Sequence, residues 1–94
     1  MPPIDIRHDP AKQRFVAEKG GEAGMLEYLE VDAETLDYHH TFVPEPIRGQ
    51  GVASHLVEFA LQYAADHKLA VVPTCPFVAA FIRSNPKFRK LVRS

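Results

Sequence analysis

The segment from Arg48 to Gly51 reads Arg-Gly-Gln-Gly and has the composition of an anion-binding loop. It lies between a strand-like run that ends at Val43 and a helix-like run that begins near Val52. The first amides of a helix have no partners inside the helix, and the helix dipole places about half a positive charge at the same end. Two glycines let a phosphate approach the backbone, and Arg48 adds a fixed positive charge. The segment therefore predicts a phosphate site, although a tight turn into a helix is an equally good explanation of the glycines.

The elements around this loop follow from the spacing of apolar residues. Strand-like runs cover residues 4–8, 13–17, 25–31 and 36–43, and their short connections predict an antiparallel meander. A helix over about 51–67, a strand over 69–74 and a helix from Pro76 to about Asn85 follow. A strand, helix and strand of these lengths form a right-handed crossover, so the fifth strand should lie parallel to the fourth. We therefore expect an α+β fold in three layers, with four antiparallel strands, a long helix, a parallel fifth strand and a C-terminal helix.

Length and composition favour one domain, residues 1–94, with an ordinary apolar share of 46%. The chain has no run near the roughly 20 apolar residues of a membrane span and no apolar signal core, so we expect a cytoplasmic protein without a membrane partner. One cysteine excludes an internal disulfide. The spacing of histidines and carboxylates shows no ligand pair, so no metal is expected.

Charge is divided unevenly along the chain. Every acid lies at or before Asp66, which gives a net charge of -7 to residues 1–66 and +6 to residues 67–94. The basic segment lacks interleaved aromatic residues or a recognisable reading module, so nucleic acid is the less favoured partner. A solvated helical face is the commonest explanation of such a segment.

Residues Arg48 to Ala53 resemble the acyl-coenzyme A pyrophosphate loop of the GCN5-related N-acetyltransferase superfamily, whose pattern is Gln/Arg-x-x-Gly-x-Gly/Ala. Together with His40-Thr41-x-Val43-Pro44 and the run from Val72 to Val78, the loop resembles a very small single-domain subgroup with a cysteine after the fifth strand. The resemblance covers the whole chain. It implies a minimal fold of that superfamily and the transfer of an acetyl group from acetyl-CoA to an amine.

The resemblance also implies where the coenzyme lies. The pantetheine arm would occupy a gap between the fourth and fifth strands, held by the backbone of Thr41, Phe42 and Val43. The thioester would lie near the end of the fifth strand, at Thr74 and Cys75. The pyrophosphate would lie on the loop and the first helical residues, namely Arg48, Gly49, Gln50, Gly51, Val52 and Ala53. The basic terminal segment would border the coenzyme phosphates.

Cys75 is the leading candidate for a catalytic side chain at this implied site. Its thiol could protonate the departing coenzyme thiolate, or it could accept the acetyl group before an amine removes it. A position just before a helix makes a cysteine more reactive. The alternative is a small buried residue that closes the strand.

His40 is the second candidate. Strand alternation places it on one face with Tyr38 and Phe42, turned toward the core or the cleft, whereas His39 lies on the outer face with Asp37 and Thr41. An imidazole there could act as a general base or orient Cys75. A histidine satisfied by backbone inside the sheet is the alternative.

The chain departs from the larger family in two ways. The helix after the fifth strand contains no tyrosine, and the helices that usually wall the acceptor site are missing between the first two strands. An open acceptor site follows, and such a site suits a protein tail or peptide. The alternative is an acceptor site that a partner or a second copy of the chain completes. Acetyl transfer to an unidentified amine, direct or assisted by Cys75, is the first hypothesis. A non-catalytic coenzyme A-binding or protein-interaction module is the second.

Overall fold

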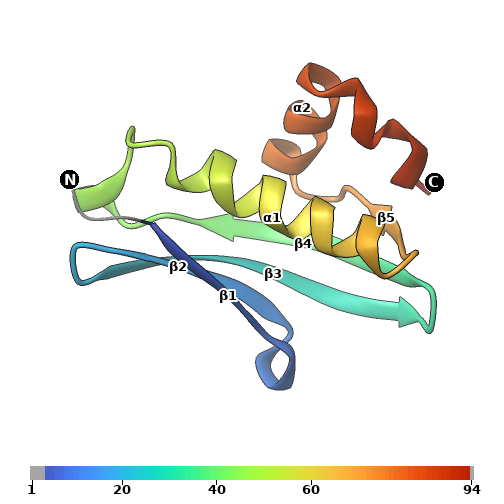
Figure 1. Ribbon diagram of the computed structural model, residues 1–94, viewed down its shortest axis with the longest axis horizontal. Coiled ribbons are helices and arrows are strands. Elements are labelled where there is room, and N and C mark those ends of the chain that lie inside the picture. The colour runs from blue at the N-terminus through green and yellow to red at the C-terminus, as the bar shows by residue number, and fades with distance from the viewer. Residues whose placement is uncertain (1–3, 94) are drawn as a thin grey trace.

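The first four strands form the antiparallel meander that the sequence predicts, and the fifth lies parallel to the fourth (Figure 1). The computed structural model describes residues 4–93. Its strands are β1 (Asp5–Asp9), β2 (Arg14–Lys19), β3 (Glu22–Asp32), β4 (Thr35–Phe42) and β5 (Ala70–Val72). Its helices are α1 (Val52–Asp66) and α2 (Pro76–Ser84), with short 3-10 turns η1 (Pro10–Lys12), η2 (Glu45–Ile47) and η3 (Pro86–Leu91).

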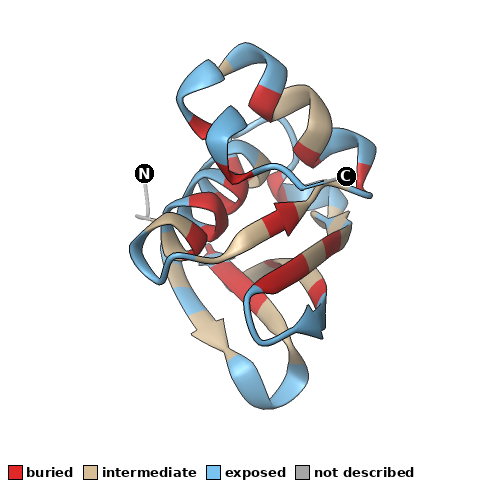
Figure 2. Ribbon diagram, turned by 90° about the vertical axis from the view of Figure 1, so that its right-hand side faces the viewer, coloured by how far each residue is buried: buried red, intermediate tan, exposed pale blue. Residues whose placement is uncertain are grey.

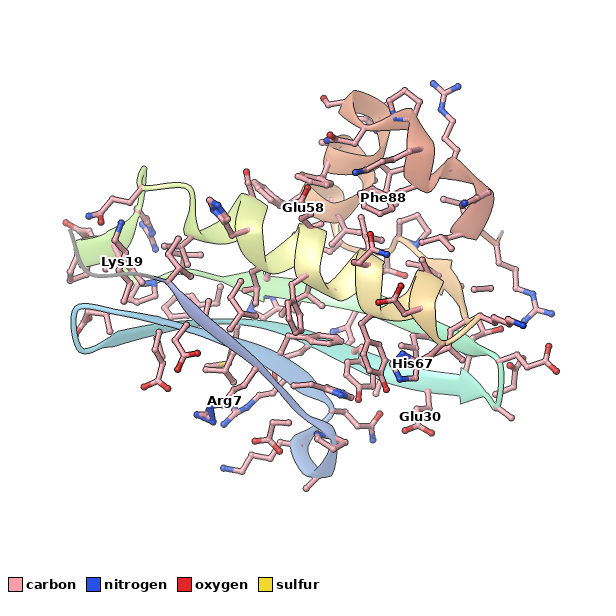
Figure 3. The ribbon with its side chains drawn as sticks, viewed as in Figure 1. Arg7, Lys19, Glu30, Glu58, His67 and Phe88 are labelled. Atoms are coloured by element: carbon pink, nitrogen blue, oxygen red, sulfur yellow. The ribbon has the colours of Figure 1, made fainter. Side chains whose placement is uncertain are left out.

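The helices α1 and α2 and the turn η3 lie on one side of the sheet. In Figure 1, α1 runs across β2, β3 and β4, while α2 and η3 lie above the β5 edge. Figure 2 shows that the buried segments of α1 and of the sheet face one another. Phe88 points from η3 toward this core and is only 3% exposed (Figure 3). Within residues 4–93, no helix covers the other face of the sheet, which we call the open face.

Strands β3 and β5 differ most in length from the prediction. β3 begins at Glu22 because a tight turn at Gly20 and Gly21, both with positive φ, lets the preceding strand pair as far as Lys19. β5 is limited to three residues, because β4 and β5 pair only from Thr35 to Asp37 on the β4 side. Regular pairing stops at this point, although the amide of Cys75 still donates a hydrogen bond to the carbonyl of Tyr38. We call the stretch of β4 beyond Tyr38, which has no regular partner in β5, the β4–β5 gap.

A β-bulge in β4 overturns the alternation predicted for His40. The β3–β4 register passes from Tyr28 opposite Tyr38 to Glu27 opposite His40, which leaves His39 as the extra residue. One extra residue reverses which face each later side chain occupies. His40 therefore points to the open face and is exposed, and it no longer shares a face with Tyr38.

The bulge turns Thr41 in the opposite direction. Thr41 pairs with Leu26, which is fully buried in the core, and directly paired residues share a face. Thr41 therefore lies on the side of the helices, whereas Phe42 pairs with Met25 and is 43% exposed.

No helix among residues 4–93 is long and apolar enough to cross a membrane.

Candidate functional site

The glycine loop forms the predicted junction between β4 and α1. Gly49 and Gly51 both adopt left-handed backbone conformations, with φ of 75° and 78°. Gly51 is the N-cap of α1, and its carbonyl accepts the first helical hydrogen bond, from the amide of His55 at 3.0 Å. The amides of residues 52–54 come before the amide of His55 and therefore have no carbonyl partner within the helix. They are available to an anion.

A cavity of about 220 Å³ lies at this junction. It is lined by Val43, Ile47, Arg48, Gly49, Gly51, Val52, Ala53, Ser54 and Phe77. Six of the predicted coenzyme-binding residues are therefore brought together around one hollow. Gln50 is not among its lining residues, because its side-chain amide turns back and donates a hydrogen bond to the carbonyl of Pro46 at 3.2 Å.

Arg48 has a second function besides its charge. Its Nε atom donates a 2.8 Å hydrogen bond to the carbonyl oxygen of Val43, so the guanidinium bridges the loop and the chain just after β4. Arg48 also lines the cavity, which keeps its positive charge beside the free amides of α1. The carbonyl of Val43 already has a partner in this arrangement, so less of that backbone is available to a pantetheine arm than the sequence indicates.

Cys75 lies just beyond the last regular pair of β4 and β5, at the start of the β4–β5 gap. It is the N-cap of α2, and its amide donates a 2.9 Å hydrogen bond to the carbonyl of Tyr38, the residue just before the bulge. Cys75 is 6% exposed, and its sulfur lies 3.5 Å from the hydroxyl oxygen of Thr41. Cys75 and Thr41 thus meet across the gap between the two strands, close to the predicted position of the thioester.

His40 does not join this pair. It points to the open face, while Cys75 contacts Thr41 on the side of the helices. The structure therefore does not support the orientation of Cys75 by His40. The two predicted catalytic residues lie on opposite sides of β4.

Three residues of the site escaped the sequence analysis. Phe77, in the first turn of α2, lines the cavity and is 41% exposed. Gly24 lies so close to the end of β4 that an added Cβ would be 3.1 Å from the carbonyl oxygen of Phe42. A glycine inside a strand is a known signal of close backbone approach and could have identified it.

Asp37 is the third. It belongs to the last pair between β4 and β5, faces the open side with its partner Leu29, and has a buried carboxyl oxygen with no hydrogen-bond partner among the described residues. No sequence pattern distinguishes it from an ordinary polar residue of a strand. Residues 4–93 contain no cluster of three histidine, cysteine, aspartate or glutamate side chains that could hold a metal ion.

Comparisons with known proteins identify the family. Residues 14–91 match the family model described as GCN5-related N-acetyl-transferase. The chain belongs to the GCN5-related N-acetyltransferase family. Members of this family generally bind acetyl-CoA and transfer acetyl groups to amines, and the cavity lies on the loop that carries the family resemblance.

Relatives of this N-acetyltransferase family member cover most of its length. Protein NATD1 of Bos taurus is 33% identical over 86 residues, which span 89% of this chain and 76% of the relative. Protein NATD1 of Danio rerio is 31% identical over 92 residues, which span 96% of this chain and 84% of the relative. The fold matches the NMR structure of a GCN5-like protein from Staphylococcus aureus with a TM-score of 0.73, at 20% identity over 96% of this chain and 88% of the other.

Proposed function

We propose that residues 1–94 act as one domain that binds acetyl-CoA and transfers its acetyl group to an amine. The observation that carries the proposal is the cavity of about 220 Å³ at the junction of β4 and α1. Free helix amides, two left-handed glycines and Arg48 surround it. These groups fit a pyrophosphate, because they offer several N–H donors and a positive charge without side chains that would block the approach.

The β4–β5 gap supports the rest of the assignment. It begins where the amide of Cys75 bonds to Tyr38 and runs along β4 toward the glycine loop, so an extended arm that starts at the loop would pass Phe42 and Thr41 on the way to the thiol. Bound acetyl-CoA supplies the activated thioester. Cys75 then either gives its proton to the coenzyme thiolate or carries the acetyl group to the amine.

We place the acceptor amine on the open face. His40 is exposed there, and Asp37 contributes a carboxyl oxygen without a partner among the described residues. The strand pairing puts six acids on this face against two arginines, namely Asp5, Asp9, Glu18, Glu27, Asp32 and Asp37 against Arg7 and Arg14. One of the six, Asp32, is paired with Arg93 at 3.2 Å. A cationic acceptor such as a protein tail or peptide fits this charge, and His40 would take a proton from its ammonium group.

A second candidate function is a non-catalytic coenzyme A-binding or protein-interaction module of the same fold. The burial of the Cys75 thiol and its separation from His40 favour this alternative. Both candidates require coenzyme binding, so binding is tested first.

The binding test uses two matched glycines. Gly49 and Gly21 both have positive φ, of 75° and 83°, and an added Cβ meets no atom within 4 Å at either position. Glu at both positions therefore brings the same strain and charge, but only Gly49 lines the cavity. Calorimetry with coenzyme A should show affinity lowered by about tenfold or more in Gly49→Glu and parent-like affinity in Gly21→Glu. Equal affinities for the two variants would refute the assigned phosphate site.

Catalysis is tested by intact mass after incubation with acetyl-CoA, in the parent and in Cys75→Ala. A gain of one acetyl group that depends on Cys75, and that an amine removes, supports the acyl-enzyme. Acetylation of added cationic peptides by both proteins supports direct transfer. Coenzyme binding without acetylation of the protein or of any amine supports the non-catalytic module.

A further inference from the structure

Thr41 is the described side chain that meets the sulfur of Cys75, with the two atoms 3.5 Å apart. The contact joins β4 to the start of α2 across the gap where β4 and β5 have separated. The sequence assigns Thr41 only a backbone role, so its hydroxyl adds a group to the site.

The contact depends on the bulge at His39. Without the extra residue, Thr41 would alternate onto the open face with Asp37. The bulge instead turns its side chain toward the core, opposite Leu26, where the thiol lies. The same irregularity therefore removes His40 from the thiol and brings Thr41 to it.

The backbone of Cys75 is fixed on both sides of its side chain. Its amide donates to the carbonyl of Tyr38 at 2.9 Å, and its carbonyl accepts from the amide of Ala79 at 3.0 Å. The main freedom left is rotation of the thiol about the Cα–Cβ bond. A partner at hydrogen-bonding distance selects one of the staggered positions.

We propose that Thr41 is the positioning residue of Cys75, holding the sulfur at the β4–β5 gap and donating its O–H to the sulfur when the thiol loses its proton. This inference rests on the proposed function and deepens it. If Cys75 gives its proton to the coenzyme thiolate, the cysteine thiolate is what remains. If Cys75 attacks the thioester carbonyl, the thiolate is the attacking form. The hydroxyl stabilises the same species in both cases.

The test is a pH titration of the thiolate in the coenzyme-free protein, followed by its ultraviolet absorbance with Cys75→Ala subtracted. The chain has one cysteine, so the difference signal comes from one residue. Thr41→Val keeps the shape of the side chain but removes the hydroxyl, and Thr41→Ser keeps the hydroxyl. Thr74→Val is the matched control, because Thr74 is the neighbour of Cys75 in the chain and is exposed.

Loss of one hydrogen bond to a charged group should raise the titration midpoint in Thr41→Val by about one pH unit. At a pH well below the midpoint, the thiolate fraction of Thr41→Val should therefore be about tenfold lower than that of the parent. Thr41→Ser and Thr74→Val should titrate like the parent. A parent-like midpoint in Thr41→Val, or an equal shift in Thr74→Val, would overturn the proposal. Circular dichroism establishes that each variant is folded, and Thr41→Ala replaces Thr41→Val if the latter is not.

The titration needs neither coenzyme nor acceptor, so its outcome is independent of the proposed function. If the midpoint shifts but calorimetry shows no coenzyme binding, the Thr41–Cys75 contact stands and the acetyltransferase assignment fails. If coenzyme binds and transfer occurs, Thr41→Val should lower kcat while the calorimetric affinity for coenzyme A stays the same.

Discussion

The phenol of Tyr38 donates a 2.6 Å hydrogen bond to the carbonyl oxygen of Ala60, while the backbone carbonyl of Tyr38 accepts the amide of Cys75 at 2.9 Å. One fully buried residue thereby joins β4 to α1 and to the start of α2. Burial, with smaller contributions from Tyr28 and Tyr63, raises the pKa of Tyr38 far above its usual value. Its hydroxyl therefore stays protonated and remains a donor throughout the physiological range.

Tyr38→Phe removes this bond and leaves the ring in place. We expect the free energy of unfolding, measured by urea denaturation, to fall by about 1 kcal/mol, the usual net contribution of a buried hydrogen bond. Tyr63→Phe is the control, because Tyr63 is only half-buried on α1 and its hydroxyl can bond to water. A loss no larger in Tyr38→Phe than in Tyr63→Phe would show that the bond does not tie the sheet to the helix.

The sequence predicts the strand, the helices and the glycine junction around the site, because these elements depend on local signals. Apolar periodicity locates β4, α1 and α2, and the glycines mark the junction at Gly49 and Gly51. The bulge at His39 was not predictable in this way, since the register of β4 is set by its pairing with β3 and not by its own residues. One unpaired residue was enough to place His40 and Thr41 on the faces opposite to those predicted.

Gly24 shows how a residue outside the loop constrains it. An added Cβ would lie 3.1 Å from the carbonyl oxygen of Phe42 and 3.3 Å from a methyl group of Val43. The backbone oxygen cannot move without shifting the end of β4. We therefore expect Gly24→Ala to lower the free energy of unfolding by about 1–3 kcal/mol, as overpacking does, and to weaken coenzyme A binding because Val43 lines the cavity.

Ala23→Ser provides the comparison for Gly24→Ala. Ala23 is the adjacent residue of β3, and its side chain points to the opposite face of the sheet. Denaturation and calorimetry on both proteins should show a change within about 0.5 kcal/mol for Ala23→Ser, as for most substitutions away from such contacts. If Gly24→Ala kept full stability and full affinity, the end of β4 would have to be free to move.

His8 gives stability a pH dependence. Its Nε2 atom lies 2.6 Å from the hydroxyl of Tyr28, and its ring stacks on Phe15 with centroids 4.6 Å apart. Burial first, and then the nearby His67, lower the pKa of His8 from 6.5, while Asp9 acts in the opposite direction. The unfolded chain therefore binds a proton at higher pH than the native protein does. Stability should be fully present above about pH 6.5 and fall as the pH drops through the lowered native value.

The change that tests this effect is His8→Gln, which cannot titrate near neutral pH but keeps a polar side chain. Urea denaturation between pH 7.5 and 5, a range of about one to two units around the ordinary pKa of histidine, should show a smaller loss of stability in His8→Gln than in the parent. His40→Gln is the matched control, because His40 is exposed. The free energy of unfolding of His40→Gln should change with pH as steeply as that of the parent. Identical slopes for His8→Gln and the parent would exclude His8 as the source.

Phe77 distinguishes binding from stability. It is 41% exposed and lines the cavity beside the glycine loop, whereas Phe59 is 39% exposed and lines a different hollow, between α1 and β1. Alanine at either position removes a similar amount of apolar surface from a half-exposed site. Because only Phe77 can contact a ligand in the cavity, calorimetry should show coenzyme A affinity lowered by about three- to tenfold in Phe77→Ala, in line with the burial of part of an aromatic ring, and unchanged in Phe59→Ala. Equal affinity in the two variants would mean that the coenzyme does not extend from the loop to α2.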